Sequence, residues 1–583
     1  MFLGHLFIFS VFYWPVSAVP TATDWLNLAH SLDGRLHHAL PFASSCFSTV
    51  NGISSTPNET ECAEVQATYG NATVRSEHFS TYMLPQWEMC QKTSERCLLD
   101  PSNTSNPAVF EDSDCLQGSV PPYYIDVHSA EDVQKAFGFS KATGVHLSIK
   151  ASGHDYKGRS SLRGSLSLWT RNLSGLKYSA DFVPEGGNKS YRAITMGAGV
   201  PFKDVYEFAD ANNVTIIGAY HQTVAPSGGW VLGGGHSVLT PVYGLGVDRV
   251  LQFKIVTPDG ELRVANEFQH PDLFWALRGG GGSTFGVVLE SSMRVEPRMS
   301  LVVAAISFPQ TAVNGVPFLK LLVDHTYRWG TEGWGGHMRG VGVETTLGSR
   351  LIPAEKFATD SGKAGLLDIL TRMVEQFSIN PYIRVVGTPF MYNHTEGSTS
   401  VTPAWRNALW HMSSSITFSW NSTAEDLQTQ YDFVSAVTQW LRDFSPNSGA
   451  YLNECDVYEP NHEELGCLPP SRWHLQIIQP PKRRSLQPQN SLVNPAQRNI
   501  EEIISIVDQV HRCFFGRITP NVEEQDRAVS AAEQKRETLR MQLEVMKQGI
   551  IGLAARSDGA LEFQHYMRKT DDEPKGQRNS VIS

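Results

Sequence analysis

The chain has 583 residues, and its 48 Lys and Arg against 59 Asp and Glu give a formal net charge of −11 at pH 7 with neutral histidines. Hydrophobic residues make up 41% of the chain, enough for a large core, so the composition excludes a wholly disordered protein. The acidic balance argues against nucleic acid as a partner, because non-specific binding to nucleic acids needs concentrated positive charge.

The chain begins with an apolar stretch. Residues 2–16 are almost entirely apolar, and Val16-Ser17-Ala18 has the pattern of a small-residue cleavage site. We therefore predict a signal peptide over residues 1–18 and a secreted or secretory-pathway location; the alternative is a buried N-terminal strand or helix. No later stretch approaches about 18 consecutive apolar residues, so no membrane association is expected after the signal is cleaved.

Sequons and cysteines agree with secretion. Eight Asn-x-Ser/Thr sequons predict a glycoprotein: Asn58, Asn71, Asn103, Asn172, Asn188, Asn213, Asn393 and Asn421. Five of the eight cysteines lie between Cys46 and Cys115. Disulfides are expected in an oxidising compartment, but the spacing does not give the pairing, and five is an odd number. No Cys-x-x-Cys pair is present, so no metal site is expected.

Four parts follow the signal. Residues 19–118 form a Cys-containing segment rich in Ser, Thr and Asn. Residues 119–300 alternate short apolar runs with helical apolar spacing, which predicts an α/β or α+β domain. The expected strands are Tyr123–Val127, Val145–Ile149, Arg192–Met196 and Val250–Val256, and the expected helices are Ala130–Thr143 and Phe202–Asn212.

The second half of the chain divides into two parts. Residues 301–460 form a second mixed region that contains five tryptophans: Trp329, Trp334, Trp405, Trp410 and Trp420. Residues 461–583 differ, because prolines interrupt their first part, a charged helical pattern covers Glu523–Gln548, and the end is polar. We expect this last part to be an atypical, partly disordered extension.

Glycine clusters carry the strongest signal. The chain lacks a complete G-x-G-x-x-G, a phosphate loop and a G-x-S-x-G nucleophile elbow. It has four other clusters within residues 152–288: Ser152–Gly158, Gly197–Gly199, Gly228–Ser237 and Arg278–Val288. Because glycine lets backbone N–H groups approach a ligand closely, four such loops favour one long phosphorylated ligand over four unrelated turns.

These stretches resemble a known family. Lys150 to Ser160, Gly228 to Ser237, Tyr243 to Asp248 and Pro271 to Gly282 are similar, in order and spacing, to the FAD-binding domain of the vanillyl-alcohol-oxidase and para-cresol-methylhydroxylase superfamily. More narrowly, the chain resembles the berberine-bridge-enzyme-like oxidases and their fungal isoamyl alcohol oxidase branch. The resemblance implies an α+β fold, with a PCMH-type FAD-binding domain and a second α+β substrate domain whose antiparallel sheet is covered by helices.

The resemblance also implies residue roles. His154 matches the histidine that bonds covalently to the 8α-methyl of FAD, and the lack of a cysteine in Tyr220–Val224 predicts that this bond is the only one. Around the pyrophosphate we expect Ser152, Gly153, Asp155, Tyr156, Gly158 and Ser160. Along the flavin ring and its ribityl chain we expect Gly228, Gly229, Gly233, Gly234, Gly235, His236 and Ser237.

The implied reaction is that of an oxidase. A hydride would leave an alcohol, carbohydrate or specialised metabolite for FAD, and O₂ would then take the electrons as H₂O₂. Residues 449–456 resemble the family strand that supplies a catalytic base, so Glu454 or Tyr451 is the candidate base, with a buried structural role as the alternative for each.

The family's closing segments are not found after Asn461. A mis-spliced gene and a divergent extension both explain this departure. The competing function is therefore a catalytically inactive flavin-fold glycoprotein that binds a ligand or partner.

Overall fold

The structure is a computed structural model that describes residues 20–459 apart from 112, 302, 304, 305, 307, 309, 310, 312, 339–345, 378–381 and 386. The expected signal peptide and the expected extension over 461–583 lie outside these residues. The chain divides into two compact units, and the first, Met1–Arg298 with Thr311–Pro488, holds every helix and strand described below. The few described residues of the second unit, within Met299–Gln310, form no regular element.

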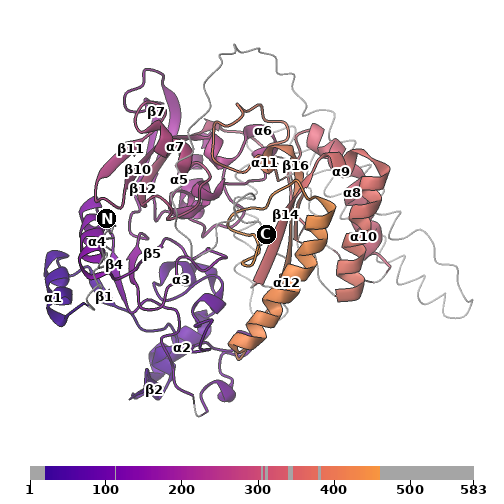
Figure 1. Cartoon of the computed structure of the whole chain (residues 1–583). Coiled ribbons are helices and arrows are strands. Elements are labelled where there is room, and N and C mark those ends of the chain that lie inside the picture. The colour runs from indigo at the N-terminus through magenta and orange to yellow at the C-terminus, as the bar shows by residue number, and fades with distance from the viewer. Residues whose placement is uncertain are drawn as a thin grey trace, which may run out of the picture. The chain divides into compact units, whose positions relative to one another are not determined.

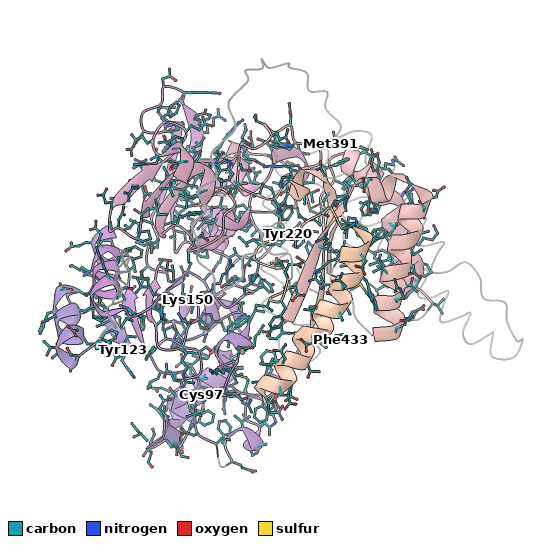
Figure 2. The ribbon with its side chains drawn as sticks, viewed as in Figure 1. Cys97, Tyr123, Lys150, Tyr220, Met391 and Phe433 are labelled. Atoms are coloured by element: carbon teal, nitrogen blue, oxygen red, sulfur yellow. A yellow bond between two sulfur atoms is a disulfide. The ribbon has the colours of Figure 1, made fainter. Side chains whose placement is uncertain are left out.

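The N-terminal segment is a set of short elements tied by disulfides. Its elements are α1 Ala22–Ser31, β1 Leu36–His38, β2 Thr49–Val50, β3 Ile53–Ser54, α2 Glu59–Thr68 and α3 Ala72–Glu77, with 3₁₀ turns at Ser44–Cys46, Pro85–Trp87 and Pro107–Val109. Cys46 is bonded to Cys62, and Cys97 (labelled in Figure 2) to Cys115. Cys90 is a buried free thiol, which accounts for the odd number.

A first sheet joins this segment to the next part of the chain. The strand order is β1-β4-β6-β5, with β4 Tyr123–Asp126, β5 Leu147–Lys150 and β6 Leu166–Trp169. β4, β6 and β5 are parallel, whereas β1 is antiparallel to β4. Helix α4, Ala130–Thr143, begins at a capping box formed by Ser129 and Asp132 and ends at Gly144, whose φ of 74° suits glycine. The first glycine cluster follows β5 at one edge of this sheet.

A second sheet is antiparallel and carries two more glycine clusters. Its order is β11-β10-β12-β8-β7, with β7 Leu176–Phe182, β8 Tyr191–Gly197, β10 Val250–Val256, β11 Leu262–Ala265 and β12 Val287–Arg294. β8 ends in the second cluster, and β12 begins in the last two residues of the fourth. Gly197 lies opposite Glu290 near the start of β12, so the antiparallel register brings these two clusters to the same end of the two strands.

Shorter elements complete this part of the chain. They are α5 Phe202–Ala211, a π-helical turn η4 Pro226–Trp230, 3₁₀ turns η5 Val231–Gly233 and η6 Gly246–Asp248, α6 Thr240–Tyr243, α7 Pro271–Leu277 and the ribbon of β9 Val214–Thr215 with β13 Glu296–Pro297. The third glycine cluster occupies η4 and η5 and the loop that follows them.

The third sheet, β14-β16-β15, is antiparallel and has helices on one face. Its strands are β14 Thr346–Pro353, β15 Tyr382–Val385 and β16 Ala408–Ile416, and its helices are α8 Gly315–Thr331, α9 Glu355–Ala358, α10 Asp360–Phe377, α11 Ala404–Asn407 and α12 Ala424–Phe444. Figure 1 shows α8, α10 and α12 on the same side of β14 and β16. Trp410, Ile352 and Met412 pack there against the helices, whereas Leu351 belongs to the core of the second sheet.

The observed architecture confirms the expected α+β fold with a helix-covered antiparallel sheet. Strands and helices also occur where the sequence pattern places them, with α4 and β10 at the expected bounds and α5 one residue shorter. The N-terminal segment is more closely integrated than expected, because β1 completes the first sheet. It also holds the start of α12, where the Ala424 backbone N–H donates to Ser94 Oγ at 2.8 Å.

Lys150 joins the N-terminal segment to the strand that precedes the first glycine cluster. Its ammonium is fully buried (labelled in Figure 2) and donates to the carbonyls of His78, Phe79 and Thr81 at 2.9, 2.5 and 2.5 Å. Burial lowers the pKa of Lys150 to about 7, while Glu88 opposes that shift. Three carbonyl acceptors match the three N–H groups of the ammonium form.

Lys150→Met is expected to destabilise the fold. The methionine keeps the apolar stem but leaves buried carbonyls without a donor, and each such group costs about 1–3 kcal/mol, so we expect a loss of about 3 kcal/mol or more. Urea unfolding followed by tryptophan fluorescence measures it. Lys254→Met is the control: Lys254 is 40% exposed in its pair with Glu290, and its loss is expected to cost less than about 1 kcal/mol. Equal losses in the two variants would contradict this account.

Candidate active site

The four glycine clusters meet in one place. Gly228 packs on the second cluster, since an added Cβ would lie 2.4 Å from the Ala198 carbonyl oxygen. The Gly281 backbone N–H donates to the Leu232 carbonyl at 2.9 Å, which ties the fourth cluster to the third. A Cβ at Gly281 would also lie 3.8 Å from Arg159 of the first cluster. The expectation that these loops build one site, rather than four separate turns, therefore has a structural basis.

The first cluster is held by its own side chains. Asp155 accepts from Arg159 at 2.7 Å and from the Ser160 backbone N–H at 3.1 Å, so the carboxylate closes the loop on itself. Burial raises the pKa of Asp155, but Arg159 and the hydrogen bonds of the loop together outweigh burial and hold the pKa below its usual value. Gly158, with φ of 70°, lies against the Trp87 indole, where a Cβ would approach within 2.3 Å. Ser160 Oγ is buried and has no hydrogen-bond partner.

His154 and His221 share the hydroxyl of Thr223. The Thr223 backbone N–H donates to His221 Nδ1 at 3.3 Å, so that nitrogen is an acceptor. The Thr223 hydroxyl lies 3.0 Å from the same nitrogen and 2.7 Å from His154 Nε2. In the tautomer with its proton on Nε2, His154 donates to this hydroxyl and has its lone pair on Nδ1.

The electrostatics agree with a neutral His154. Burial, followed by the neighbouring His221, lowers the pKa of His154 to about 3. The imidazole nevertheless keeps an intermediate exposure. His154 therefore presents a neutral, nucleophilic ring nitrogen near physiological pH.

Glu454 is enclosed by aromatic and imidazole rings. Its Oε1 is 3.7 Å from His236 Nε2, and its Oε2 is 3.6 Å from His411 Nε2. The rings of Tyr451 and His236 meet edge to face with centroids 5.1 Å apart, and Tyr451 meets His411 in the same way at 5.5 Å. Tyr220, labelled in Figure 2, tilts against His236 at 5.5 Å.

The residue before Glu454 links these rings to the His154 loop. Asn453 Nδ2 donates to the His154 carbonyl at 3.1 Å, and its Oδ1 accepts from Arg159 at 3.0 Å. On the other side, Asp456 accepts from Arg442 of α12 at 2.8 Å. The segment that carries Glu454 is thus fixed to the His154 loop and to helix α12, which gives the carboxylate a set position relative to His154.

Several of the predicted site residues contact other protein atoms. Ser237 caps a turn, because its N–H donates to Thr240 Oγ1 and its Oγ accepts from the Leu239 N–H. Ser152 is buried, and Gly153 lies against the N-terminal segment, where its carbonyl accepts from the Met83 N–H. Trp87 Nε1 donates to the Tyr156 carbonyl.

The remaining glycines of the third cluster face protein. Cβ atoms at Gly233, Gly234 and Gly235 would meet Tyr451, Val401 and Gly246 respectively. These glycines let the loop pack closely on its neighbours. Sequence reasoning missed Thr223, Asn453 and His411 as site residues, and no local motif marks His411.

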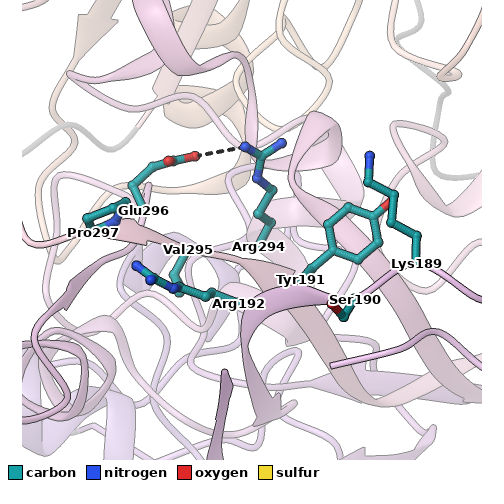
Figure 3. A pocket seen from close by; sticks show the side chains of 8 residues that line it. All are labelled: Lys189, Ser190, Tyr191, Arg192, Arg294, Val295, Glu296 and Pro297. Atoms are coloured by element: carbon teal, nitrogen blue, oxygen red, sulfur yellow. Dashed lines mark ion pairs between the residues drawn. The ribbon is translucent and has the colours of Figure 1, made fainter. Parts of the chain in front are cut away.

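Other features of the described residues lie apart from this site. A surface groove of about 350 Å³ (Figure 3) is lined by Lys189, Arg192 and Arg294, with Arg294 paired to Glu296 at 3.6 Å. It lies at the start of β8, the opposite end from Gly197. Within the described chain no group of three or more His, Cys, Asp or Glu is arranged to hold a metal, and none of the helices is long and apolar enough to cross a membrane.

Known proteins share this sequence and fold. Residues 121–266 match the family described as FAD binding domain. The chain is 38% identical to FAD-linked oxidoreductase cheF of Chaetomium globosum, over 76% of this chain and 80% of that protein. It is also 38% identical to FAD-linked oxidoreductase ffsJ of Aspergillus flavipes, over 75% and 86% respectively.

A solved structure shares the fold. The VAO-type flavoprotein MtVAO615 of Myceliophthora thermophila C1 matches with a TM-score of 0.65 at 22% identity, over 77% of this chain and 90% of that one. The fold is therefore that of the VAO-type flavoproteins. With the sequence matches, the chain belongs to the FAD-linked oxidoreductases, and FAD is its cofactor.

The glycine loops fit this cofactor. A Cβ at Gly229 would meet no atom within 4 Å, and one at Gly282 would meet only the Gly229 Cα at 3.9 Å. Gly229 is also outside the left-handed region. The fold therefore does not itself require glycine at Gly229, whereas a ligand held against the backbone would. The unpartnered Ser160 Oγ is a donor suited to a phosphate oxygen.

Gly229→Leu is expected to lower FAD content without unfolding the protein. The leucine fills space beside the loop rather than space taken by protein, so we expect purified occupancy to fall at least about tenfold, the effect of about 1.4 kcal/mol. Flavin absorbance per protein and the melting temperature measure the two effects. Gly138→Leu is the matched control, because Gly138 of α4 also has open space around its Cβ position but lies outside the glycine clusters. Full FAD occupancy in Gly229→Leu would refute this assignment.

Proposed function

We propose that the protein is a secreted oxidase that holds FAD covalently through His154 and oxidises an alcohol, carbohydrate or specialised metabolite. The observation that carries the proposal is the neutral His154, set in the loop that meets the other three glycine clusters with its Nε2 at 2.7 Å from the Thr223 hydroxyl. The bond would join Nδ1 to the 8α-carbon of FAD. Formation of this bond would release two protons and two electrons, which would pass to O₂ as H₂O₂.

Glu454 is the proposed base. Bound FAD supplies the acceptor for a hydride, and O₂ removes the electrons as H₂O₂. Glu454 would take the proton from the substrate O–H or N–H, because it is the buried carboxylate next to Asn453, which is bonded to the His154 loop. Tyr451 packs on Gly233 and on both imidazoles, which favours a role in shaping the site.

The proposed substrate is a small molecule with a polar reacting group. The sheet face that carries His411 also carries Ser349 and Ser413, which lie opposite each other in register and are both fully buried. Ser349 Oγ has no hydrogen-bond partner, so this face can offer a hydroxyl to a polar ligand. Matches to fungal FAD-linked oxidoreductases support a specialised metabolite as the substrate.

Secretion and glycosylation are part of the proposal. Each of the eight sequon asparagines is exposed, including Asn172, which donates to Asp126, and Asn71, whose side-chain oxygen caps α3. Exposure at every sequon is what glycan attachment needs. Two disulfides within the N-terminal segment agree with an oxidising compartment.

An absorbance spectrum of the purified protein tests the function. A flavin spectrum that stays with acid-precipitated protein, together with peroxide release on substrate, is expected. Flavin that separates from the precipitate would overturn the covalent bond. A colourless but folded protein would overturn the oxidase and favour the ligand-binding alternative.

A further inference from the structure

His411 stands out among the residues near Glu454. It lies on β16 of the third sheet, outside the glycine clusters, and its side chain is fully buried. Its register partner on β14 is Leu351, so the imidazole lies on the sheet face opposite the α8, α10 and α12 core. Trp405 fixes the ring from α11, with centroids 5.5 Å apart.

The two imidazoles approach different oxygens of one carboxylate. His236 faces Oε1 and His411 faces Oε2, and the two rings meet at 69° with centroids 5.5 Å apart. A carboxylate with 6% side-chain exposure is costly to ionise unless donors or positive charge face it. His236 belongs to the third glycine cluster, whereas His411 comes from the substrate-domain sheet. Glu454 is therefore held between both domains.

We propose that His411 is a positioning residue that keeps the Glu454 carboxylate ionised and aligned to accept the substrate proton. This inference rests on the proposed function, because it assigns a role relative to Glu454 as base. An Nε2–H or an imidazolium facing Oε2 stabilises the charged carboxylate, whichever form His411 takes. The proton that Glu454 accepts from the substrate stays on its carboxyl oxygen until solvent removes it.

Other titratable groups lie near His411 and Glu454. His236 comes from the third cluster, Tyr451 from the segment of Glu454 itself, and Tyr220 from the loop after β9. Arg159 interacts electrostatically with Tyr451. His411 differs from all of these in facing Oε2 at ion-pair distance with no surface exposed.

The test is an infrared titration of purified holoprotein, with Glu454→Gln subtracted to isolate the Glu454 protonated-carboxyl band. His411→Phe keeps the ring and removes both nitrogens, and His411→Gln restores a neutral donor. We expect the pH at which Glu454 protonates to rise by about one unit or more in His411→Phe and by less in His411→Gln. His337→Phe is the control, because exposed His337 contacts Tyr220 rather than Glu454 and should leave the band in place.

Two results separate the inference from the proposed function. Identical protonation of Glu454 in wild type, His411→Phe and His411→Gln overturns the role of His411, even if the variants lose turnover or melt at lower temperature. A wild type without peroxide release overturns the proposed oxidase, yet the infrared titration still decides the contact between His411 and Glu454.

Discussion

His154→Ala should convert a covalent flavoprotein into one that releases all of its FAD on acid precipitation. Alanine removes the nitrogen that forms the proposed bond, while the glycine loops that hold the cofactor remain. We expect FAD in the supernatant, little change in melting temperature, and slower turnover, because a covalent 8α-link raises the potential of a flavin. Protein-bound absorbance after precipitation, measured against total flavin, is the readout.

A neighbouring residue refines this experiment. Thr223 Oγ1 lies 2.7 Å from His154 Nε2, and by accepting from Nε2–H it would hold the lone pair on Nδ1. Thr223→Val removes that acceptor and should lower the covalent fraction, whereas Thr223→Ser keeps the hydroxyl and should retain it. His128→Ala is a control on an exposed histidine of the same domain. Covalent flavin that persists in His154→Ala would place the bond elsewhere.

Local patterns were sufficient for the glycine loops. A strand followed by glycine is a short-range signal, and the first two clusters lie where short apolar runs predict strand ends. Helix α4 was predicted to the residue, because Ser129, Asp132 and Gly144 mark its ends by local hydrogen bonding and φ alone. The His154 role came from a motif of about ten residues.

Long-range contacts were beyond such reasoning. His411 reaches Glu454 only because antiparallel pairing with β14 turns its side chain away from Trp410 and the helices. A one-residue shift of register would place it on the other face, and nothing local to residues 408–416 fixes that register. The link from Asn453 to the His154 carbonyl spans 299 positions, so it depends on how the third sheet packs on the first cluster.

Glu454→Gln should leave FAD bound and lower turnover by about 10²–10⁴-fold, the usual contribution of a general base. Glutamine keeps the shape of the side chain and its reach toward His236 and His411, but it cannot accept a proton. The rate of flavin bleaching by substrate under anaerobic conditions measures the reductive step alone. We expect this rate to fall as much as turnover does, because the proton leaves the substrate in that step.

Two variants show whether the loss is specific to Glu454. Glu459→Gln changes a buried carboxylate of the same segment that pairs with Arg442 at 2.9 Å, so it should lower stability and leave the rate of the folded enzyme nearly unchanged. Tyr451→Phe keeps the packing on Gly233 and removes the phenol hydroxyl, the other candidate base. If the bleaching rate fell about 100-fold or more in Tyr451→Phe and stayed high in Glu454→Gln, the phenol would be the base. The Glu454 carboxylate would then only supply a negative charge that faces His236 and His411.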